Sequence, residues 1–226
     1  MRSTNSHCVL KFVRLAVVAL VATTSAGQLA QAVPMVPGDS VLGSPEAKPD
    51  PLSTIVDSLT SPFATTNYTG SVVSTVLSGD TTNKLGGLTF TYLVYNDPGS
   101  VNVLERLSVL GFAGLATDVS YNPTVPALGV APSLMDRSFG SGDTIGWQFV
   151  GPPLSPAGVI APGTNSYLLV VQTGVSGYTR GVANVIDGVS TSVAALVPIP
   201  EPTSLVMAGL GAAGLAAVVA RRRRRK

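Results

Sequence analysis

From residue 68 onward, apolar and polar positions alternate with a period of two along several short segments. In residues 88–95 the even-numbered positions form one apolar face, and in residues 144–150 positions 145, 147 and 149 do the same. A period of two is typical of a β-strand with one buried face. We therefore expect a strand in each of these two segments.

Three further segments have strand character. Residues 167–172 read Tyr-Leu-Leu-Val-Val-Gln, a continuous apolar run that indicates a central strand buried on both faces. Residues 182–186 and 189–193 are rich in valine and flank Asp187-Gly188, a dipeptide typical of tight hairpin turns. We expect a buried central strand and, after it, a hairpin.

Two segments fit strands less clearly. Residues 71–77 are rich in valine, serine and threonine, which favours a strand. Residues 104–110 carry leucine at 104, 107 and 110, a spacing that also suits a helix. We assign a strand there because Gly111 and Gly114 penalise a continuing helix and because β segments lie on both sides.

Short strands separated by Gly- and Pro-rich turns favour an all-β fold, an antiparallel β-sandwich of Ig-like or jelly-roll type. Proline-rich loops are expected at residues 122–132 and 151–163. We place the sandwich at residues 63–197 and interpret residues 33–62 as an extended leader that adds at most one edge strand.

Residues 1–32 have the organisation of a secretory signal peptide. Three basic residues precede an apolar run at 15–22, and small residues follow it. This run is too short for a membrane anchor. An Ala-x-Ala pattern predicts cleavage after Ala32, and a similar pattern ending at Ala26 is the alternative. We expect a signal helix that is removed on export.

Cleavage would remove both His7 and Cys8, which are the chain's single histidine and single cysteine. The mature segment would then lack disulfides, Cys/His zinc sites and the imidazole base of Ser-His-Asp or Cys-His catalysis. Paired-carboxylate hydrolysis requires two acids facing each other, and no spacing here predicts such a pair. We expect a non-enzymatic protein without a cofactor.

The charge of the chain is divided between its ends and its middle. Nine of the fourteen Lys and Arg residues lie before residue 33 or after residue 200. Between these positions five cations stand against eleven acids, a net charge of −6. A nucleic-acid partner requires a basic patch and is therefore not expected.

Two sets of residues suggest ligands. Asp118, Asp136 and Asp143, the last two flanking an oxygen-rich loop at 138–142, provide ligands of the kind that Ca²⁺ prefers, although acids in loops are commonly only solvated. Aromatic residues suited to stacking on sugar rings form the second set, although the lone tryptophan alternates with core residues. They are Tyr92, Tyr95, Tyr121, Trp147, Tyr167 and Tyr178.

The last segment, residues 198–226, combines three features in order. Pro200, Glu201 and Pro202 form a stiff collar, and residues 204–220 follow as an uncharged span whose apolar part begins at 205. A cluster of cations ends the sequence: Arg221, Arg222, Arg223, Arg224, Arg225 and Lys226. Cations beside a span remain in the cytoplasm, so the preceding domain is expected on the far side of a membrane.

This arrangement resembles the PEP-CTERM sorting domain of bacterial exported proteins. The resemblance implies that an exosortase-type membrane protease recognises the segment and cuts near residues 200–202. A plain membrane anchor is the alternative. The resemblance favours a surface or extracellular-matrix structural protein associated with biofilm exopolysaccharide, after an inner-membrane intermediate. A carbohydrate-binding module and a secreted hydrolase are the rival functions.

Overall fold

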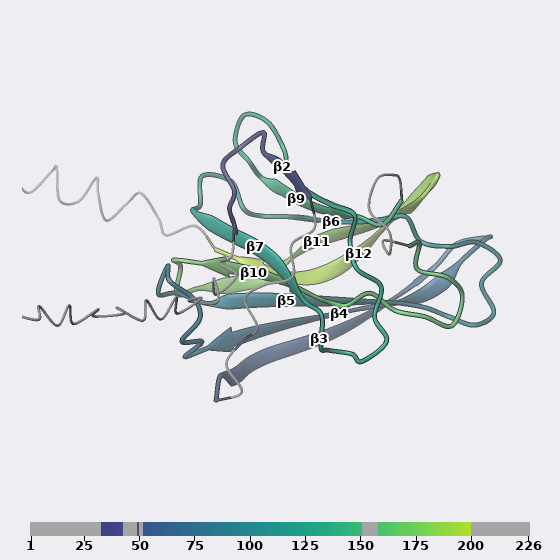
Figure 1. Ribbon diagram of the computed structural model, residues 1–226, viewed down its shortest axis with the longest axis horizontal. Helices are drawn as coiled ribbons and strands as arrows, with labels where there is room; N and C mark the ends of the chain where they lie inside the picture. Colours follow the sequence, from purple (N-terminus) through teal and green to yellow (C-terminus); the bar gives the residue numbers. More distant parts are fainter. Residues whose placement is uncertain (1–32, 43–48, 50–51, 151–157, 200–226) are drawn as a thin grey trace, which may run out of the picture.

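A computed structural model describes residues 33–42, 49, 52–150 and 158–199. Within these residues, every regular element is a β-strand, and the strands form two antiparallel sheets packed as the two layers of a sandwich (Figure 1). No helix in the described ranges has the length and apolar character needed to cross a membrane. The expected signal helix, its cleavage site at Ala32 and the span at 204–220 lie outside the described residues.

The first layer, called sheet A, has the strand order β1-β7-β10-β5-β4-β3. Each neighbouring pair is antiparallel. Its strands are β1 (Val33–Pro34), β3 (Thr54–Ala64), β4 (Thr69–Ser78), β5 (Thr89–Asn96), β7 (Thr117–Asn122) and β10 (Leu168–Thr173). The apolar run predicted as a central strand is therefore β10, between β7 and β5.

The second layer, called sheet B, has the order β12-β11-β6-β9-β8-β2, also antiparallel throughout. Its strands are β2 (Ser40–Leu42), β6 (Arg106–Leu110), β8 (Leu134–Arg137), β9 (Thr144–Gln148), β11 (Tyr178–Asp187) and β12 (Val189–Pro198). The hairpin predicted at Asp187-Gly188 is confirmed, and Gly188 supplies a positive φ of 61°.

The core lies between the facing sides of the two sheets. Sheet A contributes Phe90 and Tyr92 and sheet B contributes Ile145 and Trp147, each with 0 % exposure. These residues come from the alternating segments at 88–95 and 144–150, so the predicted buried faces are confirmed. Burial of large apolar side chains of this kind is the main favourable contribution to folding.

The expected strands at residues 71–77 and 104–110 are confirmed as β4 and β6. In β6, Leu107 and Val109 face the core, whereas Leu110 is half-buried, which is the period of a strand and not of a helix. Strands β7 and β8 were not predicted. Each is short and contains only two apolar residues, and their pairing with β10 and β9 identifies them.

The leader expected at residues 33–62 differs from the structure. It supplies β1, β2 and most of β3, which is an eleven-residue strand at the outer edge of sheet A. One side of β3 is largely exposed, so its aliphatic residues are scattered and the strand was not evident from the sequence. The register of β3 against β4 shifts between Ile55 and Asp57, and Pro62 lies within the strand. The folded domain therefore begins well before residue 63.

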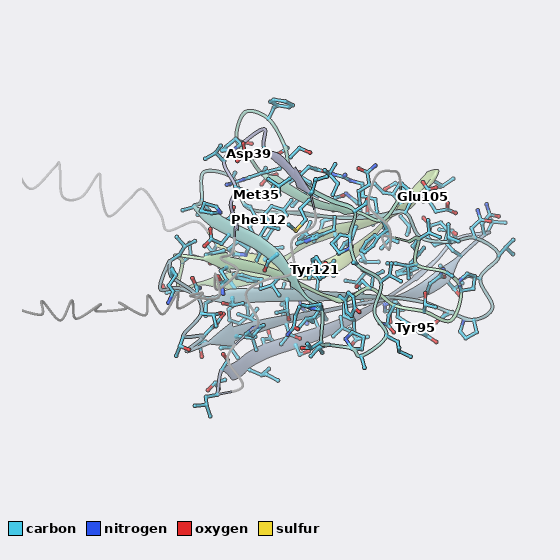
Figure 2. All side chains as sticks on the ribbon, in the orientation of Figure 1. Met35, Asp39, Tyr95, Glu105, Phe112 and Tyr121 are labelled. Atoms are coloured by element: carbon cyan, nitrogen blue, oxygen red, sulfur yellow. The ribbon has the colours of Figure 1, made fainter. Side chains whose placement is uncertain are left out.

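A buried arginine holds together one end of the sandwich. Arg137, on β8, is 4 % exposed, and all five of its N–H groups donate hydrogen bonds. The acceptors are the carbonyl oxygens of Met35, Phe112, Leu115 and Gly142 and the hydroxyl of Thr117, at 2.6–3.0 Å. Figure 2 shows Met35 and Phe112 side by side at this end. Burial lowers the pKa of Arg137, and the charge of Asp39 opposes that shift.

Candidate functional site at the carboxyl-terminal strand

Strand β12 leads the chain directly into the segment that carries the collar. Pro198 is the last residue of β12 and pairs with Tyr178 of β11. The amide of Ile199 donates a hydrogen bond to the carbonyl of Gly177 at 3.0 Å, which extends the pairing by one residue. Pro200, Glu201 and Pro202 and the six terminal cations lie outside the described residues. The folded domain therefore continues to the residue before the collar.

Side chains of sheet A also form hydrogen bonds to the backbone of β12, which is a strand of sheet B. The hydroxyl of Tyr92 donates to the carbonyl of Leu196 at 2.8 Å, and the amide of Leu196 donates to the hydroxyl of Ser74 at 3.0 Å. Tyr92 is completely buried, and this burial raises the pKa of its hydroxyl. It remains a neutral hydrogen-bond donor. Leu196 is thus fixed two residues before the end of β12.

A second tyrosine secures the start of β12. The hydroxyl of Tyr68 lies 2.7 Å from the carbonyl oxygen of Val189 and 3.2 Å from that of Val185. Burial raises the pKa of Tyr68, and the nearby charge of Asp187 raises it further. Both ends of the β11–β12 hairpin are therefore attached to the opposite layer through tyrosine hydroxyls.

We expect Tyr92→Phe to lower the free energy of unfolding by about 1–3 kcal/mol, because the buried carbonyl of Leu196 loses its side-chain donor. Denaturant unfolding of the purified mature protein measures this change. Tyr95→Phe is the control, because the half-buried Tyr95 hydroxyl has no hydrogen bond to the described residues. Equal stabilities of the two variants would contradict the role given to Tyr92.

The acidic residues considered for Ca²⁺ are not brought together. Asp136 is bound by Arg106 through two hydrogen bonds of 2.5 and 2.6 Å, which engage both carboxylate oxygens. The guanidinium crosses over Gly146 of β9, where a Cβ atom would clash with the Arg106 Nη2 atom. Asp136 therefore forms an ion pair across the outer face of sheet B.

The other two acids have separate environments. One carboxylate oxygen of Asp143 accepts a hydrogen bond from the amide of Gly111 at 3.1 Å. Asp118 lies on β7, in the opposite sheet from Asp136. In the described part of the chain, no group of three or more Asp, Glu, His or Cys side chains is placed to hold a metal ion. The oxygen-rich loop at 138–142 gains no support as a Ca²⁺ site.

The aromatic residues considered for sugar stacking are also dispersed. Trp147 and Tyr92 are core residues whose ring centroids lie 5.8 Å apart, as expected for the lone tryptophan. Tyr121 and Tyr167 stack on each other, with centroids 5.8 Å apart and an interplanar angle of 15°. Tyr95 is half-buried and lies apart from Tyr121 (Figure 2). These side chains form no shared sugar platform within the described residues.

The comparisons with known proteins identify the segment that follows β12. The family model of the PEP-CTERM protein-sorting motif matches residues 198–225. No curated protein and no solved structure matches the chain. The motif defines an exported protein that an exosortase sorts at the membrane towards the surface or the extracellular space. The chain therefore carries a PEP-CTERM sorting motif at residues 198–225, as the collar, span and cations predicted.

Sequence reasoning missed the residues that hold the folded domain to this motif. Tyr92 was predicted to lie on an apolar strand face and was also considered for sugar stacking, Tyr68 was given no role, and Arg137 was only one of five cations. The available signal for Tyr92 was its position on the apolar face of residues 88–95. For Tyr68 and Arg137 no local signal exists, because their acceptors come from distant parts of the chain.

Proposed function

We propose that the protein is a non-enzymatic structural component of the bacterial surface or extracellular matrix. The single observation that carries this proposal is the continuity between the sandwich and the sorting motif at Pro198, which both ends β12 and begins the matched segment. The five residues 199–203 reach at most about 18 Å when fully extended. The domain is therefore presented to the membrane as a rigid unit with a very short spacer.

Two further observations support a structural role. The segment between residues 33 and 200 lacks histidine and cysteine, which removes the commonest nucleophile and base pairs. Polar side chains outside the core form structural interactions with each other, such as the ion pair between Arg106 and Asp136. Cleavage near residues 200–202 would release the sandwich with a net charge of −6 between residues 33 and 200, compatible with a hydrated matrix.

The test is performed in the organism that produces the protein. We expect the processed protein in the extracellular matrix fraction, and a deletion strain to form a less cohesive matrix that the wild-type gene restores. Incubation of the purified mature protein with the producer's exopolysaccharide should generate no new reducing ends. Bond cleavage would instead establish a hydrolase, and tight retention on the polymer would establish a carbohydrate-binding module. Either result, or absence from the matrix, would overturn the structural proposal.

A further inference from the structure

The outer face of sheet A carries buried polar side chains on β7 and β10. Asp118 and Ser120 of β7 and Gln172 of β10 alternate with the core residues of their strands, so they point away from the sandwich interior. Their exposed fractions are nevertheless 7 %, 1 % and 0 %. Asp118 is the direct cross-strand partner of Gln172. Buried polar groups require hydrogen-bond partners, so each of these side chains must be accounted for.

The orientation of the Gln172 amide is fixed by Asp80. Its Nε2 atom donates to the Asp80 Oδ2 atom at 3.0 Å and to the Thr82 hydroxyl at 2.8 Å. Asp80 Oδ2 also accepts from the Thr89 hydroxyl at 2.6 Å. Burial alone would raise the pKa of Asp80, but the hydrogen bonds from Thr82, Thr89 and Gln172 lower it. Asp80 is thus an ionised acceptor, and a flipped amide would place the Gln172 carbonyl against it.

This orientation leaves an excess of acceptors next to β7. The Gln172 Oε1 atom, one carboxylate oxygen of Asp118 and the hydroxyl of Ser120 are all buried, and none has a hydrogen-bond partner. They account for three of the seven such side-chain atoms in the described residues. The first two can only accept while Asp118 is ionised. Burial raises the pKa of Asp118.

We propose that this cluster, Asp118, Ser120 and Gln172, binds Ca²⁺ on the outer face of sheet A. A hard cation takes carboxylate, amide and hydroxyl oxygens together, which satisfies all three unpartnered atoms at once. Asp80 and Asp118 lie on the two sides of Gln172, so two carboxylates offset the ion's charge. The cluster supplies three side-chain oxygens, and water completes the coordination. The affinity expected of such a site is in the range of extracellular modules, with Kd about 0.1–1 mM.

The test uses the purified mature protein after removal of divalent ions with a chelator. We expect 10 mM CaCl₂ to raise Tm by roughly 3–10 °C. Calorimetric titration of the wild-type protein should show one Ca²⁺ per chain. Asp118→Asn should abolish the shift, and Ser120→Ala should reduce it. Asp57→Asn removes the same charge from β3 of the same sheet and should retain the full shift.

A second comparison distinguishes an ion site from a proton site. Without Ca²⁺, Asp118→Asn should unfold at or above the wild-type temperature, because the new amide supplies the missing donor to Gln172. If Asp118→Asn does not fold, the Tm shift of Ser120→Ala with Ca²⁺ and the calorimetric titration of the wild-type protein test the proposal instead. A wild-type Tm that depends on pH but not on Ca²⁺, or an Asp118→Asn variant with the full Ca²⁺ shift, would overturn the proposal. An equal shift with NaCl at matched ionic strength would overturn it too.

Discussion

Arg137→Met is expected to lower the free energy of unfolding by about 3–5 kcal/mol, because it breaks a buried hydrogen-bond network. Five acceptors lose the guanidinium as a donor, and a methionine side chain fills the space without replacing any bond. The carbonyls of Met35 and Phe112 each keep one other donor. Removal of a buried charge recovers part of the loss, since the charge is costly to desolvate. The remainder is the cost of leaving buried carbonyl groups unsatisfied.

Denaturant unfolding of the purified mature protein measures this effect. Two further variants serve as comparisons. Arg137→Lys keeps the charge but has three donors on one nitrogen, so we expect a loss between those of wild type and Arg137→Met. Arg180→Met removes an exposed arginine and should remain within about 0.5 kcal/mol of wild type. If Arg137→Met and Arg180→Met have the same free energy of unfolding, the Arg137 guanidinium does not hold this end of the sandwich together.

The largest functional effect is expected in the sorting motif. Glu201→Ala, or replacement of Arg221–Arg225 by serine, should leave a longer precursor retained in the membrane, whereas the wild type is shortened and released. Proline lacks an amide donor and disfavours a helical residue before it, so we expect the collar to bind the protease in an extended form. An extended segment suits the binding cleft of a protease, and we expect Glu201 to supply a charged contact there. The cations oppose transfer of the tail across the bilayer.

The measurement is the intact mass of the protein from a host that carries the exosortase. Glu105→Ala removes a distant glutamate on the folded domain and should be processed as the wild type is. A wild-type mass that still includes residues 203–226 would show that the tail is only an anchor. Normal shortening of Glu201→Ala would instead show that the protease does not require this carboxylate.

The fold was predictable where burial alternates along a strand. Residues 88–95 and 144–150 each place large side chains on one face, and the sequence alone therefore indicates β5 and β9. Strand β7 alternates as well, but only Val119 and Tyr121 are apolar, and this short signal was missed. Its identity depends on pairing with β10, whose partner residues lie about fifty positions away.

The candidate sites were predictable only where their residues are contiguous. The sorting motif occupies one continuous segment, so its order and spacing are visible in the sequence. The cluster of Asp118, Ser120 and Gln172 depends instead on the register between β7 and β10 and on the orientation that Asp80 imposes. Asp118 was grouped with Asp136 and Asp143 by residue type, whereas the sheets separate them.

The outer edge of β3 has a consequence for how copies of this protein behave when they are crowded together. Eleven residues at the margin of a sheet would normally act as a template on which further chains add as strands, leading to fibres. The register shift after Ile55 interrupts the regular spacing of that edge, and Pro62 removes one donor from it. Strand addition at this edge is therefore disfavoured in released molecules, and cohesion between copies through β3 must come from other contacts.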